Sequence, residues 1–158
     1  MELKMQKQCL ILMVGLPGSG KSTKAQTLSS EYEAEIVSTD ALRKEKVGQE
    51  GDISQDNQIF RLAYECCSKL LREGKSVVFD ACNLSPTARK RVLSCCQGRY
   101  NIEKIAYVMS ADAWECIERD SKRERVCGAN IILNYAERYT PPRMSEGFTQ
   151  IIRERRFM

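Results

Sequence analysis

The chain of 158 residues contains no histidine. Histidine is the commonest general base and the commonest neutral metal ligand in proteins. Its absence excludes Ser-His-Asp hydrolases, Cys-His proteases and zinc sites with a histidine ligand. Any proton transfer must therefore be carried out by Asp, Glu, Lys, Tyr or Cys.

Closely spaced cysteine pairs of the C-x-x-C type are also missing, although the chain has eight cysteines. This absence argues against zinc and thioredoxin-like sites. Cys66-Cys67 and Cys95-Cys96 lie in segments with helical periodicity, where a free thiol behaves as a small apolar side chain. We therefore expect reduced cysteines and a cytoplasmic protein.

Long apolar runs are absent too. The first run, residues 9–14, is too short for a signal peptide or a membrane span. No repeat or linker interrupts the chain, so we expect one domain over residues 1–158, with no membrane and no protein partner indicated. The 25 basic and 21 acidic residues give a net charge of +4. This charge suits an anionic ligand but does not by itself indicate nucleic acid.

What the chain does have is a regular alternation of short apolar runs and longer amphipathic segments. Strands are predicted at residues 10–14, 35–38, 76–79 and 102–109, with a last strand within 148–153. Helices are predicted at residues 21–33, 58–73, from 85 onward, 112–125 and 130–139, and residues 48–57 read as a loop. This order predicts an α/β fold with a parallel central sheet of four to five strands and helices on both faces. Ligands bind such sheets at the carboxyl ends of the strands.

The sequence GLPGSGKS at residues 15–22 matches the phosphate-loop pattern G-x-x-x-x-G-K-[ST] between a predicted strand and a predicted helix. Backbone N–H groups of such a loop, together with the helix dipole, bind phosphate oxygens. We predict a P-loop NTPase fold that uses ATP and Mg²⁺, with Lys21 on the β- and γ-phosphates and Ser22 on the metal. The predicted nucleotide-binding set comprises Gly15, Pro17, Gly18, Ser19, Gly20, Lys21, Ser22, Thr23 and Arg119.

Two aspartates fall at the ends of predicted strands, beside this loop. One of Asp40 and Asp80 would support Mg²⁺, and the other would accept the proton of an attacking hydroxyl. The residues alone do not rank them. Both also have a structural interpretation as helix caps, with Asn83 and Ser85 competing for the cap near Asp80. Arg43 lies one helical turn after Asp40, so both side chains can face one substrate.

A basic cluster follows on the charged segment 112–125. Arg119 and Arg123 are four residues apart and share a helix face, so one of them is a candidate for a lid arginine over the transferred phosphate. The alternative is a solvated helix face paired with acidic neighbours. The rest of the cluster and these neighbours are Lys122, Arg125, Glu118 and Glu124. The basic run at residues 89–91 is expected at the surface.

Taken together, the motifs resemble the kinase domain of bacteriophage-type 5′-polynucleotide kinases, within the small, zeta-toxin-like P-loop kinases. The resemblance rests on GLPGSGKST, STDALR, VVFDACNLSPTARKR, ERDSKRERV and PPRMSEGF, and it spans about residues 9–148. It implies that Asp40 is the general base and that Arg43 binds the phosphate next to the acceptor hydroxyl. It further implies that Asp80 supports the acceptor or metal side, and that Arg123 is the arginine of a helical lid.

The chain departs from that family in two ways. No D-x-D-x-T phosphatase signature occurs, and the few aromatic residues (7% of the chain) include none within or beside STDALR for base stacking. The leading hypothesis is an ATP-dependent kinase whose substrate is the 5′-hydroxyl end of DNA or RNA. A kinase of a small hydroxylated metabolite and a nucleotide-binding protein without transfer activity are the alternatives.

Overall fold

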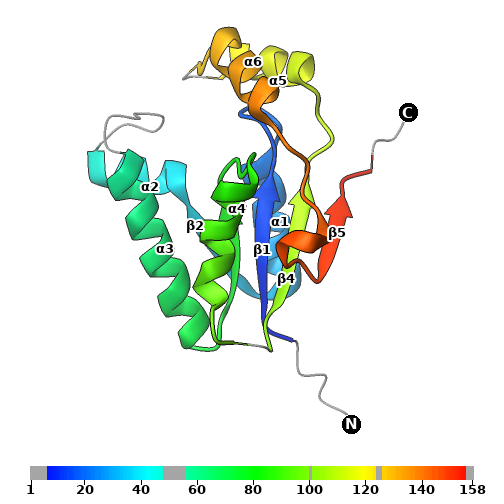
Figure 1. Ribbon diagram of the computed structural model, residues 1–158. Coiled ribbons are helices and arrows are strands. Elements are labelled where there is room, and N and C mark those ends of the chain that lie inside the picture. The colour runs from blue at the N-terminus through cyan, green and yellow to red at the C-terminus, as the bar shows by residue number, and fades with distance from the viewer. Residues whose placement is uncertain (1–6, 48–55, 100, 124–125, 156–158) are drawn as a thin grey trace.

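The computed structural model describes residues 7–47, 56–99, 101–123 and 126–155. Within them, five strands form one parallel sheet in the order β2-β3-β1-β4-β5 (Figure 1). Their bounds are β1 Cys9–Val14, β2 Ala34–Ser38, β3 Ser76–Asp80, β4 Glu103–Val108 and β5 Gln150–Arg153. The predicted parallel sheet is confirmed, including the last strand near the C-terminal end of the described chain.

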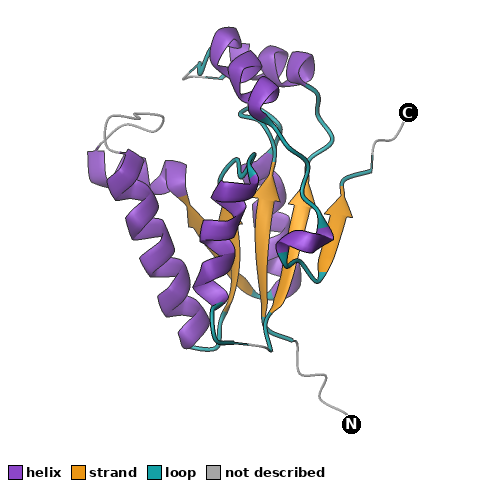
Figure 2. Cartoon of the chain, viewed as in Figure 1, coloured by secondary structure: helices purple, strands orange, loops and turns teal. Residues whose placement is uncertain are grey.

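Helices cover both faces of this sheet, as Figure 2 shows. One face packs against α1, and the other packs against α3 and α4. A further pair, α5 and α6, lies beyond the carboxyl ends of the strands (Figure 1). The helices are α1 Lys21–Tyr32, α2 Thr39–Val47, α3 Asp56–Arg72, α4 Pro86–Leu93, α5 Ala113–Ser121 and α6 Ala129–Arg138, with short 3₁₀ turns η1 Ser94–Cys96 and η2 Met144–Glu146.

The central strand β1 is buried along its whole length because helices cover both sides of it. Leu10 and Leu12 pack into the core beneath α3 and α4. The alternate residues Ile11 and Met13 pack into the core beneath α1. This two-sided burial explains why β1 is continuously apolar and does not alternate with polar residues.

Local signals set several helix boundaries. The Ser85 hydroxyl accepts a hydrogen bond from the Ala88 N–H at 3.1 Å, and Pro86 is the first residue of α4, as the sequence predicts. Gly74, with φ of 83°, follows the end of α3. The predicted loop at 48–57 falls mostly outside the described residues, and α3 already begins at Asp56.

Arg89 is buried, contrary to the prediction from sequence. The run at residues 89–91 was predicted at the surface, but only Lys90 and Arg91 are exposed, whereas Arg89 is fully buried. Its guanidinium pairs with both carboxylate oxygens of Glu146, at 2.7 and 3.1 Å. The guanidinium donates a third hydrogen bond, to the Asn83 carbonyl, at 2.9 Å. A buried arginine needs such partners, and the sequence alone could not show that Glu146 would meet it from 57 residues away.

Candidate active site

The phosphate loop connects β1 to α1 at the carboxyl end of the sheet. Gly18 and Gly20 have φ of 83° and 91°, a left-handed conformation that glycine adopts without strain. Gly20 precedes α1 without any side-chain cap, so the first N–H groups of the helix are left to a ligand. The Ser19 hydroxyl is buried beside them with no hydrogen-bond partner. These donors fit a bound phosphate group.

The remaining loop residues of the predicted set surround this centre. A Cβ at Gly15 would come within 2.7 Å of the Ser19 hydroxyl, so the loop closes tightly only with glycine there. Pro17 is partly exposed, and Thr23 is exposed in the first turn of α1. The Lys21 amine folds back and donates to the Leu16 carbonyl at 3.0 Å, which keeps it over the loop.

The segment after β3 fastens this loop to the sheet. The Gly15 N–H donates to the Cys82 carbonyl at 3.1 Å. The Asn83 amide donates to the Met13 carbonyl at 2.8 Å, and Asn83 takes a left-handed φ of 50°. From the sequence, Asn83 is predicted only as a possible helix cap, and the motif VVFDACNLSPTARKR that contains it assigns it no role of its own. Its place three residues after a strand-ending aspartate was the available signal.

Ser22 and Asp80 form the pair that fits a metal ion. The Ser22 hydroxyl donates to the Asp80 carboxylate at 2.9 Å, and Asp80 is almost completely buried at the last position of β3. A serine hydroxyl beside a carboxylate is the donor set that P-loop NTPases offer to Mg²⁺. The two residues would hold the ion between the loop and the sheet. Among the described residues, no three or more Cys, Asp or Glu side chains gather in a group that could hold a metal ion.

Strand register brings the segment that carries Asp40 to the same edge of the sheet as this pair. Ser38, the last residue of β2, is paired with Asp80 on β3. The Ser38 hydroxyl accepts the Ala41 N–H at 3.2 Å and so caps α2. The Asp40 carboxylate is therefore free of that capping hydrogen bond, and it instead pairs with the Arg43 guanidinium. The Asp40 side chain is 47% exposed and the Arg43 side chain only 10%, so the carboxylate keeps access to solvent.

Helix α5 lies directly on the phosphate loop. A Cβ at Gly18 would approach the Cys116 carbonyl to 2.5 Å, so the loop and the helix backbone are in close contact. The Arg119 guanidinium donates to the Ser19 carbonyl at 3.1 Å. Burial raises the pKa of the Cys116 thiol, while the charges of Lys21 and Arg119 lower it. Lys21 and Arg119, two cations of the predicted set, thus each donate to a carbonyl of the loop.

Helix α5 ends at Ser121, so Arg123 lies just after the helix and not on one helix face with Arg119 as predicted. Asp120 is buried and accepts the Cys127 and Gly128 N–H groups, each at 2.9 Å, and it pairs with Arg123 at 3.6 Å. Burial raises the pKa of the Cys127 thiol, and the charges of Asp120 and Asp40 raise it further, whereas Arg123 lowers it. Nothing in the sequence distinguished Asp120 from the charged residues around it.

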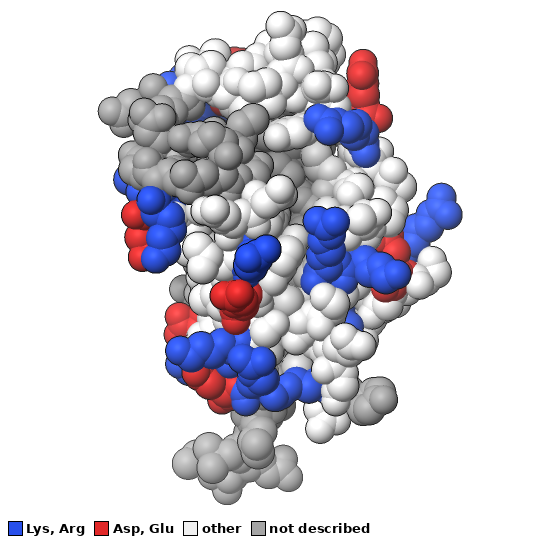
Figure 3. Space-filling view, turned by 60° about the vertical axis from the view of Figure 1, so that its left-hand side comes forward, with Lys and Arg blue, Asp and Glu red and all other residues white. Residues whose placement is uncertain are grey.

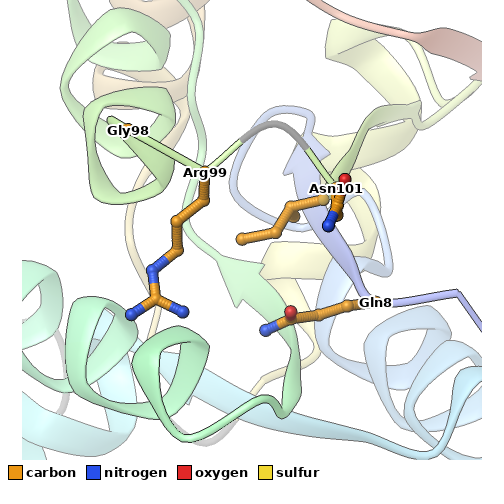
Figure 4. A pocket seen from close by; sticks show the side chains of 5 residues that line it. Gln8, Gly98, Arg99 and Asn101 are labelled. Carbon is orange, nitrogen blue, oxygen red and sulfur yellow. The ribbon is translucent and has the colours of Figure 1, made fainter.

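The hollow shown in Figure 4 lies at the opposite end of the sheet. It has a volume of about 330 Å³ and is lined by residues that precede β1 and β4, among them Gln8 and Asn101. Gln8 donates to the Leu71 and Lys75 carbonyls at 2.8 Å, and Arg99 donates to the Leu71 carbonyl at 3.1 Å. These polar groups serve the fold and are remote from the phosphate loop.

Comparison with known proteins agrees with this geometry. The AAA domain profile matches residues 10–142, from β1 through α6 to the proline pair. The chain belongs to the AAA domain family. No curated protein sequence matches it.

Solved structures with a similar fold include Kti12, a gluconokinase and a chain of an RNA repair complex. Kti12 of Chaetomium thermophilum in complex with ADP-AlF3 has a TM-score of 0.70 at 20% identity, covering 92% of this chain and 88% of its own. A gluconokinase of Sinorhizobium meliloti 1021 has a TM-score of 0.63 at 17% identity, covering 94% and 83%. A chain of the Pnkp1/Rnl/Hen1 RNA repair complex has a TM-score of 0.67 at 19% identity, covering 85% and 45%. The fold of this AAA domain is thus that of P-loop kinases.

Two other findings bear on the expectations from sequence. All eight cysteines are free thiols, as expected. Among the helices described, none combines the length and the apolar character that crossing a membrane requires.

Proposed function

We propose that this AAA domain is an ATP-dependent phosphotransferase that moves the γ-phosphate of ATP to a hydroxyl group. The observation that carries the proposal is the convergence of three features at one end of the sheet. They are the phosphate loop, the Ser22–Asp80 pair at 2.9 Å, and the partly exposed Asp40 carboxylate, two residues after the Ser38 that is paired with Asp80. A donor site, a metal position and a candidate base thereby share one edge.

Each side chain then has a role that its contacts support. Lys21 and the loop N–H groups would bind the β- and γ-phosphates, and Arg119 would add charge from α5. Mg²⁺, held by Ser22 and Asp80, would neutralise phosphate charge. Asp40 would take the proton from the acceptor hydroxyl, since the chain has no histidine to do so. Arg123, which follows α5 and pairs with Asp120, would stabilise charge on the transferred group.

For the acceptor we propose the 5′-hydroxyl end of a polynucleotide. Arg43 supports this choice because its guanidinium is held against Asp40, beside the proposed base. A phosphate adjacent to the reacting hydroxyl would find a cation at that position. The similarity in fold to a chain of an RNA repair complex is compatible with this acceptor.

A small hydroxylated metabolite is the second candidate acceptor. Among the described residues on the face shown in Figure 3, basic and acidic side chains are interspersed with uncharged surface and form no continuous basic track. A long polynucleotide is usually bound along such a track. The similarity in fold to a gluconokinase is compatible with a small acceptor.

One experiment tests the activity and chooses the acceptor. The protein is incubated with γ-labelled ATP, Mg²⁺ and single-stranded DNA or RNA carrying a 5′-hydroxyl, and in parallel with sugars and nucleosides while ADP release is measured. Label on the oligonucleotide supports the polynucleotide acceptor, and ADP release with a metabolite alone supports the second candidate. Lys21→Ala should abolish either signal, whereas Lys24→Ala should not, because Lys24 lies over the Tyr107 ring. Absence of transfer to every acceptor would reject the proposed activity.

A further inference from the structure

Strands β1 and β3 stop pairing just before the phosphate loop, and Asn83 continues the contact between them. The register of the two strands ends at the pair Leu12 and Phe79. Beyond that pair, the Asn83 amide donates to the Met13 carbonyl at 2.8 Å and to the Ala81 carbonyl at 3.3 Å. Asn83 is buried, so its amide serves this junction between the strands and does not face solvent.

The residues on either side of Asn83 are bound as well. The Cys82 carbonyl accepts the N–H of Gly15, the first residue of the phosphate loop, at 3.1 Å. The Leu84 carbonyl accepts the Thr140 N–H at 2.9 Å, and Thr140 belongs to the segment that follows α6. These three consecutive residues therefore join β1, the phosphate loop and the segment after α6.

The backbone of Asn83 is held in an unfavourable conformation. Its φ of 50° is left-handed, which costs free energy for any residue but glycine, although asparagine tolerates it better than most. The fully buried Arg89 guanidinium donates to the Asn83 carbonyl at 2.9 Å, and the Glu146 carboxylate pairs with the same guanidinium. Arg89 thus fixes the peptide group of Asn83, while β1 fixes its side chain. Strained residues that their surroundings maintain in this way cluster at functional sites.

The role of helix cap, which the sequence also allows for Asn83, is taken by another residue. The Ser85 hydroxyl accepts the Ala88 N–H at 3.1 Å at the start of α4. An aspartate caps helices as well as an asparagine does, but an ionised carboxylate cannot donate to the Met13 carbonyl. Donation to β1 therefore explains why this position carries an amide.

We propose that Asn83, clamped by Arg89, is a positioning residue that sets the phosphate loop against Asp80 and so determines how tightly the chain binds nucleotide with Mg²⁺. The proposal rests on the nucleotide site of the proposed function. Asp80 ends β3 three residues before Asn83, and its carboxylate accepts the Ser22 hydroxyl at 2.9 Å. A shift of this segment relative to the loop moves that carboxylate away from Ser22. Groups that hold an ion lose affinity for it when the contacts that orient them are removed.

The test replaces Asn83 by glycine, which adopts the left-handed conformation without strain and removes only the side-chain amide. Calorimetric titration of the full chain with ADP and Mg²⁺ measures the dissociation constant, and urea denaturation of the same samples measures their stability. Asn83→Gly should raise the dissociation constant by about 10- to 100-fold. Glu33→Gly is the matched control, because Glu33 is the other non-glycine residue with a left-handed φ among the described residues, and it lies at the far end of α1. Its dissociation constant should equal that of the wild type.

A second variant tests the clamp. Arg89→Lys keeps a positive charge for Glu146, but a single ammonium group lacks the fork that joins Glu146 to the Asn83 carbonyl. It should also raise the dissociation constant, and the double variant with Asn83→Gly should bind ADP no more weakly than Asn83→Gly alone, since both act through one segment. A double variant whose loss is the product of the two single losses would overturn the role of Arg89. Asn83→Gly decides the role of Asn83 even if Arg89→Lys fails to fold.

The Mg²⁺ requirement separates positioning from a merely structural role. The Mg²⁺ concentration that half-saturates ADP binding should rise in Asn83→Gly, because Asp80 is then less well placed beside Ser22. An unchanged Mg²⁺ requirement would overturn the link to Asp80. A wild-type chain that binds ADP no better than folded Asn83→Gly would overturn the positioning role and leave the proposed function standing. A wild-type chain that binds no nucleotide would overturn both.

Discussion

At the scale of single residues, the contacts of Asp40 decide how it should be tested. Ser38 caps α2, so the Asp40 carboxylate is not needed for that purpose, and its side chain is half exposed. An asparagine at this half-exposed position keeps one oxygen that can accept from Arg43, so the domain should stay folded. The contribution of Asp40 to activity can then be measured directly.

Asp40→Asn should lower kcat by roughly 10²–10⁴-fold while ATP still binds, because the amide cannot accept the proton of the acceptor hydroxyl. Steady-state kinetics on the accepted substrate, together with nucleotide titration, measure both effects. Glu45→Gln is the matched control, since Glu45 is a well-exposed carboxylate on the same helix, and its kcat should not change. Near-normal turnover of Asp40→Asn would mean that another group is the base.

Arg43→Ala should raise KM for the acceptor by about tenfold or more while the KM for ATP changes little. Loss of a charge-assisted contact of about 1.5–3 kcal/mol accounts for this factor. Initial-rate measurements with each substrate varied in turn separate the two constants. Lys44→Ala, an exposed cation next to it on α2, should leave both constants unchanged. A change in the ATP constant alone would show that Arg43 does not contact the acceptor.

At the scale of elements, the buried Arg89–Glu146 pair joins α4 to η2 and holds the segment after β3. Arg89→Ala should lower the free energy of unfolding by about 3–5 kcal/mol, since it leaves the mostly buried Glu146 carboxylate without its partner. Urea denaturation followed by circular dichroism measures the loss. Lys90→Ala, the exposed neighbour on α4, should cost little. Equal stability of the two variants would show that the pair contributes nothing.

The same pair predicts a pH dependence. Burial raises the pKa of the Glu146 carboxyl, but hydrogen bonds from Arg89 and from the Arg143 N–H outweigh it, so the net pKa lies below its usual value of 4.5. A lowered pKa contributes stability that is present above pH 4.5 and is lost as the pH falls through the folded-state value. The stability difference between wild type and Glu146→Gln should therefore be constant near neutral pH and shrink only in acid below that value.

The contact between α5 and α6 depends on Asp120. Asp120→Ala leaves two backbone N–H groups without their acceptor, at an expected cost of about 1–3 kcal/mol to local stability. Hydrogen exchange at the Cys127 and Gly128 amides should accelerate by about five- to a hundredfold, while exchange in β1 stays slow. Glu118→Ala, an exposed carboxylate on α5, serves as the control. Unchanged exchange at both amides would show that Asp120 does not hold the two helices together.

At the scale of the whole molecule, nucleotide binding should stabilise the domain. ADP with Mg²⁺ at 100 times its Kd should add about 2.7 kcal/mol to the free energy of unfolding, because the ligand binds the folded chain only. Thermal unfolding with and without nucleotide measures the shift. Lys21→Ala should reduce it strongly, and Asp40→Asn should keep it. A shift in the wild type without turnover on any acceptor would favour a nucleotide-binding protein that does not transfer phosphate.

Much of the fold could be predicted because its signals are local. The phosphate-loop pattern, the apolar run of β1 and the Ser85-Pro86 helix start each depend on neighbouring residues, and each is confirmed as a structural element. The helix on which Asp40 lies was harder to predict. Strand β2 ends at Ser38 and α2 begins at the next residue, Thr39, so no loop marks the boundary between them. The last residue of α2, Val47, adjoins the segment outside the described residues.

The sequence by itself therefore determined the parallel α/β architecture and the candidate donor site, because strand patterning and loop chemistry are encoded within short segments. Only the tertiary structure decided which charged residues are paired and buried. Arg89 meets Glu146, and Asp120 holds the start of α6. These partners are distant in sequence or indistinguishable from their neighbours in pattern. A buried charge without a partner costs free energy, so each buried charged side chain needs a partner. Only folding brings that partner near.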